Sequence, residues 1–279
     1  MIRKYYIQNK KGGSDRLDKL ISKNLKLDQI NTFKLINQGS VWDNKKMLRF
    51  KDPSTIITDQ LILINSPEFP VVEYILDKND IIYEDQYILA VYKKCGYPTC
   101  PTPYADIHSL EYAVNTYYQK SEQLFPVNRI DMPTDGIVLF SKNRTDSAVF
   151  YNLFSDRNIT KAYLAVTPRI AAFIGRTIRI DKPVTFKGVT KNAKTIIRSI
   201  ANNDNFQFFI AYPLTGRTHQ IRIHFAENIT PLIGDATYGK YNRIDRLGLT
   251  CVYYRFVHPF TKKTIRIKLP IFKIIDSFI

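Results

Sequence analysis

Apolar residues of this chain occur in short runs and alternating stretches between turn residues. These patterns predict strands over residues 61–64, 81–92, 137–140, 161–166 and 206–214, with two strands in the second range. Apolar residues three and four apart predict helices over residues 16–21, 28–36, 109–118 and 145–154. One further segment, residues 217–225, fits both periods. Ile221 and Ile223 alternate like a strand, whereas Ile221 and Phe225 lie four apart as in a helix.

Residues at the helix ends suggest where each helix starts and stops. We expect Ser14 or Asp15 to cap the first helix and Gly39 to end the second. In the last of the predicted helices, Ala148, Val149 and Leu153 are expected to face the core.

Positive charge is densest at the N-terminal end. Residues 1–65 hold 13 lysines and arginines and 6 aspartates and glutamates, a net charge of +7, whereas the remaining 214 residues carry +9. We therefore predict a separate N-terminal module over residues 1–65. Pro67 and Pro70 disfavour regular structure, so residues 66–80 are predicted to be a linker. Residues 81–279 show no second linker and are predicted to form one large domain.

Composition indicates a polyanionic partner. The 279 residues carry a net charge of +16, which favours nucleic acid over a membrane surface. No apolar run reaches 18 residues, so we expect no membrane span. Three cysteines lack disulfide-like spacing, and four histidines form no metal spacing with them. We expect a cytoplasmic, monomeric protein without a metal site.

A charged pair precedes the apolar run at 137–140. Arg129 and Asp131 lie two apart, and residues two apart on an extended segment point the same way. Arg129, or a cation from elsewhere in the chain, would keep the Asp131 carboxylate ionised and oriented, as a nucleophile requires. A structural ion pair that caps a turn is the alternative interpretation.

Two further segments carry candidate chemistry. As a strand, residues 161–166 place Lys161 and Tyr163 on one face, where Tyr163 belongs either to a site or to the core. Arg217 and Arg222 lie beside apolar positions in the following segment. Each of these arginines has two possible roles, a solvated surface side chain or the cation that pairs with Asp131.

The order of these motifs resembles the RluA family of pseudouridine synthases over residues 81–279. The resemblance is carried by Asn128-Arg129-Ile130-Asp131-x-x-Thr134-x-Gly136, Lys161-x-Tyr163-x-Ala165, Gly216-Arg217-Thr218-His219-Gln220-Ile221-Arg222, Pro231-Leu232-Ile233-Gly234-Asp235 with Tyr238-Gly239, and Phe256-x-His258-Pro259. Asn128 stands where the family usually has His, and Asp135 where it usually has Ser.

The N-terminal module resembles an S4-type RNA-binding domain over about 50 residues. The similar residues are Arg16-Leu17-Asp18-x-Leu20, Leu35-Ile36-x-x-Gly39-x-Val41, and Asp59 before residues 61–64. Residues 28–31 depart from the Ser-Arg pair that usually opens the second helix. An S4-like module in front of the catalytic domain is a known arrangement in the RluA family.

The resemblance implies an α+β fold, with a mixed, largely antiparallel central sheet flanked by helices. It implies isomerisation of uridine to pseudouridine without a cofactor, on a base flipped out of the RNA. In this scheme Asp131 acts at the sugar, either as the nucleophile or as a base. Arg222 pairs with Asp131, Arg129 helps hold the RNA, and Tyr163 stacks on the uracil and helps remove a proton. It also implies that residues 218–227 form a helix.

The sequence is compatible with more than one RNA target and with two alternative functions. Large-subunit ribosomal RNA is favoured over transfer RNA. The alternatives are an inactive RNA-binding assembly factor, or a hydrolase that uses Asp135 as a second carboxylate. The expected RNA contacts are Arg16, Lys19, Lys34, Lys45, Lys161 and Arg217.

Overall fold

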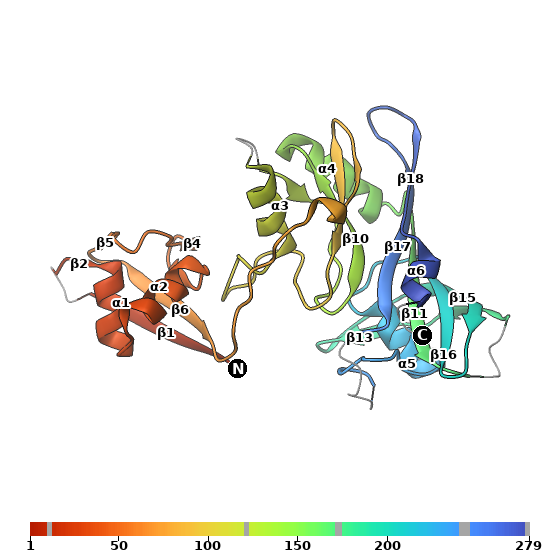
Figure 1. Cartoon of the computed structure of the whole chain (residues 1–279), viewed down its shortest axis with the longest axis horizontal. Coiled ribbons are helices and arrows are strands. Elements are labelled where there is room, and N and C mark those ends of the chain that lie inside the picture. The colour runs from red at the N-terminus through yellow and green to blue at the C-terminus, as the bar shows by residue number, and fades with distance from the viewer. Residues whose placement is uncertain (10–12, 120–122, 171–174, 240–245, 277–279) are drawn as a thin grey trace. The chain divides into compact units, whose positions relative to one another are not determined.

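The computed structural model describes residues 1–9, 13–119, 123–170, 175–239 and 246–276 (Figure 1). The chain divides into two compact units. The first unit joins residues 1–75 to residues 100–117, and the second joins residues 76–99 to residues 118–279. Each unit contains its own cluster of buried apolar side chains.

The first unit contains a four-stranded antiparallel sheet in the order β1-β6-β3-β4. Its strands are β1 (Ile2–Gln8), β6 (Leu61–Pro67), β3 (Val41–Asp43) and β4 (Leu48–Arg49), and a second pair joins β2 (Asp15–Arg16) to β5 (Ile56–Ile57). Helices α1 (Leu17–Leu25) and α2 (Gln29–Asn37) bury Leu17, Ile21 and Ile36 in one core with Ile62 and Ile64 of β6. Both predicted helices and the strand over 61–64 are confirmed.

The start of α1 differs from the prediction. Arg16, not Ser14 or Asp15, precedes the helix, and its side chain makes no capping hydrogen bond. Arg16 instead forms an ion pair with Asp18 at 2.8 Å, so Asp18 supplies negative charge to the first turn. By contrast, α2 begins after Asp28, where the predicted helix starts. The Asp28 side chain accepts a hydrogen bond from the backbone N–H of Asn31.

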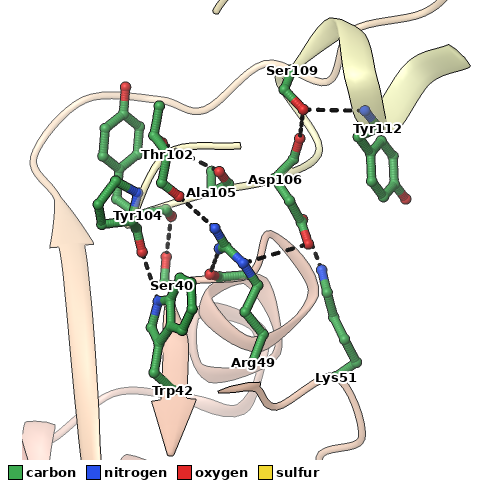
Figure 2. Close-up of polar contacts among 12 residues, drawn as sticks. Ser40, Trp42, Arg49, Lys51, Thr102, Tyr104, Ala105, Asp106, Ser109 and Tyr112 are labelled. Carbon is green, nitrogen blue, oxygen red and sulfur yellow. Dashed lines mark hydrogen bonds and ion pairs between the residues drawn. The ribbon is translucent and has the colours of Figure 1, made fainter. Parts of the chain in front are cut away.

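A segment of the first unit, residues 100–109, is bound to the N-terminal module by polar contacts (Figure 2). We call it the docked segment. Three module side chains donate hydrogen bonds to its main-chain oxygens: Ser40 to Tyr104 (2.6 Å), Trp42 to Pro103 (2.7 Å) and Arg49 to Thr102 (2.6 Å). Asp106 adds an ion pair with Lys51 at 2.8 Å. The three hydrogen bonds end on main-chain oxygens, so these contacts do not depend on the side chains of the docked segment, whereas the ion pair depends on Asp106.

One ten-stranded sheet organises the described part of the second unit, in the order β12-β15-β16-β11-β17-β10-β8-β7, with β18 beside β17 and β9 beside β10. The strands are β7 (Ile81–Glu84), β8 (Ile88–Lys93), β9 (Phe125–Pro126), β10 (Asp135–Ser141), β11 (Ile159–Pro168), β12 (Thr177–Asp181), β15 (Lys194–Asn202), β16 (Phe206–Pro213), β17 (Leu249–Val257) and β18 (Thr264–Lys268). A separate hairpin pairs β13 (Val184–Phe186) with β14 (Val189–Lys191). Only the β10–β17 pairing in this described sheet is parallel. The predicted mixed, largely antiparallel sheet is confirmed.

Five helical segments complete the fold within the part of residues 76–276 that the structure describes. They are η1 (Lys78–Asp80), α3 (Leu110–Tyr118), α4 (Arg144–Ser155), α5 (Gln220–Asn228) and α6 (Ile271–Asp276). The ambiguous segment is therefore helical from Gln220 onward. Helix α4 exists as predicted, but the prediction for its inward face was wrong at two of three positions. Ala148 and Val149 are exposed and Leu153 is partly buried, whereas the buried side chain of this helix is Phe150. No described helix has both the length and the apolar character needed to cross a membrane.

The parallel pairing of β10 with β17 brings two backbones unusually close. Gly136 pairs with Cys251 and has a φ of +111°, a conformation that favours glycine. A Cβ atom at Gly136 would overlap the carbonyl of Cys251 and lie 2.5 Å from its nitrogen. Glycine is therefore required where the strand after Asp131 meets the strand that faces Tyr163.

Candidate active site

Asp131 lies in the loop before β10, and its side chain is 28% exposed. The residues around it are tied to the segment after β8 by hydrogen bonds: Lys93 Nζ to Met132 O (3.1 Å), Gly96 N to Met132 O (3.0 Å), Cys95 Sγ to Pro133 O (3.1 Å) and Thr99 Oγ1 to Ile130 O (3.2 Å). Burial lowers the pKa of Lys93 to about 8. The main chain on both sides of Asp131 is thus anchored while its carboxylate stays accessible.

Arg222 of α5 lies between two carboxylates. Its Nε and Nη2 donate to Asp235 at 2.9 and 2.7 Å, and its Nη1 lies 3.7 Å from Asp131 Oδ2. Asp235 also accepts the backbone N–H groups of Thr237 and Tyr238 at 3.0 and 3.1 Å. One edge of the guanidinium is therefore fixed by a two-pronged contact, and the remaining nitrogen is held toward Asp131.

The buried Arg222–Asp235 pair is charged on both sides. Burial alone would raise the pKa of Asp235, but hydrogen bonds and the charge of Arg222 lower it overall. Burial alone would likewise lower the pKa of Arg222, but Asp235 and Asp131 raise it overall. Arg222 is consequently a permanent cation beside Asp131.

His219 is the other basic side chain close to Asp131. It immediately precedes α5 with a φ of +56°, an uncommon conformation for a residue other than glycine. Its Nε2 lies 3.7 Å from Asp131 Oδ2, and its Nδ1 shares a hydrogen bond of 2.9 Å with the Tyr238 hydroxyl. Burial lowers the pKa of His219, and Arg222 lowers it further, whereas Asp131 raises it. The overall lowering of this pKa favours the neutral imidazole, and Arg222 supplies the positive charge.

Tyr163 and Lys161 share one face of β11. Burial raises the pKa of Tyr163 well above 10, and contacts with Cys251 and the charge of Asp131 add to the rise. Burial lowers the pKa of the half-buried Lys161, whose Nζ would lie 3.6 Å from a Cβ at Gly216. The tyrosine is thus a phenol at neutral pH, and Lys161 adjoins the Gly216–Arg222 motif.

Two predicted arginines lie elsewhere. Arg129 is exposed, and among the described residues no carboxylate lies within 4 Å of it. Arg217 donates from Nε to the carbonyl of Asn192 at 3.1 Å. Of the three arginines considered as a partner for Asp131, the structure places Arg222 beside it.

Asp135 does not add a free charge to the site. It is 2% exposed, accepts a hydrogen bond from the Tyr92 hydroxyl at 2.7 Å and pairs with Arg246 at 2.6 Å. Its carboxylate is thus held by a cation inside the protein. It does not provide the second accessible carboxylate that a hydrolase would use.

The four candidate RNA contacts of the module all belong to the first unit. Arg16, Lys19, Lys34 and Lys45 are all exposed, and Arg16 is in addition paired with Asp18. Asp131 belongs to the second unit.

Three residues at the site were missing from the predicted set, namely His219, Asp235 and Tyr238. Each stands inside a motif that already carried the family resemblance, so the signal was present but had no assigned role. The described residues contain no group of three His, Cys, Asp or Glu side chains able to hold a metal ion.

Comparison with known proteins identifies the class. Residues 87–227 match the family described as RNA pseudouridylate synthase. The uncharacterized RNA pseudouridine synthase MG209 of Mycoplasma genitalium is 27% identical, over 92% of this chain and 89% of that protein. The tRNA pseudouridine synthase C of Vibrio cholerae is 26% identical, over 68% of this chain and 89% of that protein. The ribosomal large subunit pseudouridine synthase C of Buchnera aphidicola is 25% identical, over 92% of this chain and 90% of that protein.

The fold agrees with these matches. The structure of human RNA pseudouridylate synthase domain containing 1 superposes with a TM-score of 0.57 at 22% identity, covering 68% of this chain and 82% of that one. This chain belongs to the RNA pseudouridylate synthase family, of the RluA type. It is accordingly an enzyme, an RNA pseudouridine synthase.

Proposed function

We propose that this enzyme converts specific uridines of structured RNA to pseudouridine, with Asp131 acting at the sugar and large-subunit ribosomal RNA as its substrate. The observation that carries the proposal is the position of Arg222 Nη1, 3.7 Å from Asp131 Oδ2. A partly exposed carboxylate beside a permanently charged, buried guanidinium is oriented by that cation and accessible to a substrate.

The reaction breaks the bond from the ribose to N1 of the uracil and forms a bond to C5, which loses its proton while N1 gains one. The target base must first leave the RNA stack, at a cost of about a few kcal/mol. In this scheme Asp131 works at the sugar, Tyr163 stacks on the base and takes part in removing the C5 proton, and Arg129 holds the RNA. The exposure of Arg129 suits a contact with RNA rather than with Asp131.

The N-terminal module acts as an S4-like RNA-binding domain in this proposal. Its net charge of +7 and its exposed Lys19, Lys34 and Lys45 support that role. Lys161 and Arg217 contribute further contacts next to the reacting base. The functional division is residues 1–65 for binding, 66–80 as a linker and 81–279 for catalysis.

The choice of ribosomal RNA rests on coverage of the relatives. The Buchnera protein named for the ribosomal large subunit matches 92% of this chain, whereas the Vibrio protein named for tRNA matches 68%. Transfer RNA is the alternative substrate. Pseudouridine mapping in ribosomal and transfer RNA, from cells with and without the gene, decides between them.

The catalytic assignment is tested with Asp131→Asn. This substitution keeps the size of the side chain and removes its charge, so pseudouridine formation should be abolished while RNA binding stays nearly intact. Asp204→Asn, at a fully exposed aspartate, is the matched control and should behave like wild type. Turnover by Asp131→Asn within tenfold of wild type would contradict the role of Asp131. Unchanged pseudouridine maps without the gene would contradict the proposed function.

A further inference from the structure

The β13–β14 hairpin is bound at its base to helix α5 (Figure 1). Val184 and Ala193 are buried in one apolar cluster with Ile223 of α5. Where the chain enters the hairpin, His224 Nε2 lies 3.0 Å from the carbonyl oxygen of Lys182. A carbonyl oxygen can only accept, so Nε2 is the donor. The entry to the hairpin is thereby fixed to α5.

The chain that leaves the hairpin is bound to the Gly216–Arg222 motif. Arg217 Nε donates to the carbonyl oxygen of Asn192 at 3.1 Å. Gln220 Nε2 donates to the carbonyl oxygen of Lys194 at 2.9 Å. Both ends of the hairpin are therefore held by the segment that supplies the basic side chains of the site.

The hairpin also contacts the site directly. The Phe186 ring packs edge-on against the His219 imidazole, with ring centroids 4.7 Å apart and an interplanar angle of 60°. His219 Nε2 in turn lies 3.7 Å from Asp131 Oδ2. A single side chain thus lies between the hairpin and Asp131.

The tip of the hairpin projects away from the protein. Lys187 and Gly188 form its two-residue turn, with φ values of +48° and +76°. A Cβ atom at Gly188 would meet nothing within 4 Å, and Val189 is 56% exposed. The hydroxyls of Thr185 and Thr190 share a hydrogen bond of 2.8 Å across the two strands. The tip is therefore an ordered element that a large ligand can reach.

Positive charge at the tip lacks an acidic partner. Residues 182–203 contain five lysines and arginines and no aspartate or glutamate. Lys194 is paired with Asp181 at 2.9 Å. Lys187 and Lys191 are exposed, and among the described residues no carboxylate oxygen lies within 4 Å of either ammonium group. Two such cations beside an aromatic ring are suited to the phosphate backbone of an RNA strand.

We propose that the β13–β14 hairpin is an RNA-binding element that contacts the nucleotides flanking the flipped uridine, with Lys187 and Lys191 each neutralising a phosphate. Because the base of the hairpin is bound to the motif that contains Arg222, RNA held at the tip is held close to Asp131. This inference rests on the RNA substrate and the Asp131 site of the proposed function.

Lys187→Gln/Lys191→Gln removes both charges from the tip. Each neutralised phosphate contributes about 0.7–0.9 to the slope of log affinity against log salt, so the slope should decrease by about 1.4–1.8. The RNA is a transcript of large-subunit ribosomal RNA. The matched control is Lys262→Gln/Lys263→Gln, in the turn between β17 and β18, where Lys262 also has a positive φ of +59°. This turn lies away from α5 (Figure 1), and the control should keep the wild-type slope.

Photo-crosslinking locates the tip on the RNA. The variant Val189→p-benzoyl-phenylalanine should crosslink to nucleotides beside the uridine that the enzyme modifies. Val257→p-benzoyl-phenylalanine is the control, because Val257 of β17 is 53% exposed and Val189 is 56% exposed. It should give no crosslink at those nucleotides. In single-turnover assays at saturating enzyme, Lys187→Gln/Lys191→Gln should react within threefold of wild type, because the two lysines bind RNA and do not react.

Three outcomes would overturn the proposal. The first is an unchanged salt slope in Lys187→Gln/Lys191→Gln, and the second is crosslinking from position 189 only to nucleotides far from the modified uridine. The third is a slower reaction at saturating enzyme without weaker binding, which would mean that the hairpin only supports the fold of the site. If the wild-type enzyme forms no pseudouridine in ribosomal or transfer RNA, the proposed function fails, while the salt slope still tests the two lysines.

Discussion

Arg222 contacts two carboxylates, and substituting it alone disturbs both. We therefore compare Arg222→Gln with the double variant Arg222→Gln/Asp235→Asn. The single variant leaves the Asp235 charge buried with backbone N–H groups as its remaining partners. The double variant replaces the buried ion pair with two neutral amides, yet it still leaves Asp131 without its neighbouring cation.

The stability of the two variants should differ clearly. The Asp235 side chain is 0% exposed and that of Arg222 is 4% exposed. Removing one partner of a buried pair costs about 3–5 kcal/mol, a large part of a typical total of about 5–15 kcal/mol. The double variant leaves no unpaired charge in the interior, so it should recover a large part of the lost stability.

The activity should not recover in parallel. Two charges 3.7 Å apart attract by about 4.5 kcal/mol at an effective dielectric constant near 20, and by about 1 kcal/mol in bulk water. Because Asp131 is 28% exposed, we expect a value of about 1.4–2.8 kcal/mol between these limits. At about 1.4 kcal/mol per tenfold, the double variant should form pseudouridine about 10–100-fold more slowly than wild type.

Urea denaturation measures the stability of each variant, and single-turnover assays with excess enzyme measure the chemical step. Asp235→Asn alone serves as the control, because it keeps the cation beside Asp131. A double variant that is stably folded and reacts within threefold of wild type would refute the role of Arg222 toward Asp131.

Three further outcomes are expected. Gly136→Ala should lower stability by at least about 3 kcal/mol in thermal unfolding, because the new methyl group meets the Cys251 backbone at a φ of +111°. The pKa of Asp235 lies below its ordinary value of 3.8, so its pairing stabilises the fold above that pH. This contribution should disappear as the pH falls through the lowered pKa. The fall in the free energy of unfolding at acid pH, measured with urea, should therefore be shallower in Asp235→Asn. Lys19→Glu/Lys34→Glu should weaken RNA binding and reduce the slope of log affinity against log salt.

Each of these outcomes has its own control. Gly188→Ala, in open space at a φ of +76°, separates the backbone clash from the positive φ alone, and a smaller loss is expected there. An acid limb that is identical in wild type and Asp235→Asn would contradict the pairing as its origin. Charge reversal is preferred to deletion of residues 1–65, because deletion would also remove the partners of the docked segment. An unchanged salt slope would mean that the two lysines do not neutralise phosphates.

Elements with strong local patterns could be predicted from the sequence. Strands β10, β11 and β16 could be predicted because each contains its own pattern of apolar side chains. The predicted helices are also present. The ambiguous segment at 217–225 was resolved by family resemblance, because its own periodicity fits strand and helix equally. Asp131 and Arg222 were proposed as a pair on the same basis, and the structure places them 3.7 Å apart.

Features that depend on distant partners could not be predicted. Arg246 pairs with Asp135 across 111 positions, and that contact exists only after β10 and β17 have met. Arg222 lies closer to Asp235 than to Asp131, at 2.7 Å against 3.7 Å. The positions of these residues in the sequence do not indicate which of the two carboxylates is the closer partner. At the start of α1, Arg16 engages Asp18 directly, so helix entry does not require the cap that local preferences suggested.

The contact around Trp42 has a practical consequence for experiments in solution. Trp42 is the single tryptophan of the chain, its indole N–H donates to Pro103 of the docked segment at 2.7 Å, and the Arg49 guanidinium lies 4.1 Å from the ring centroid. Emission excited selectively in the indole band therefore comes from one place, with no background from other tryptophans. Its wavelength and quenching report directly whether the docked segment is in contact with the module, without any extrinsic dye.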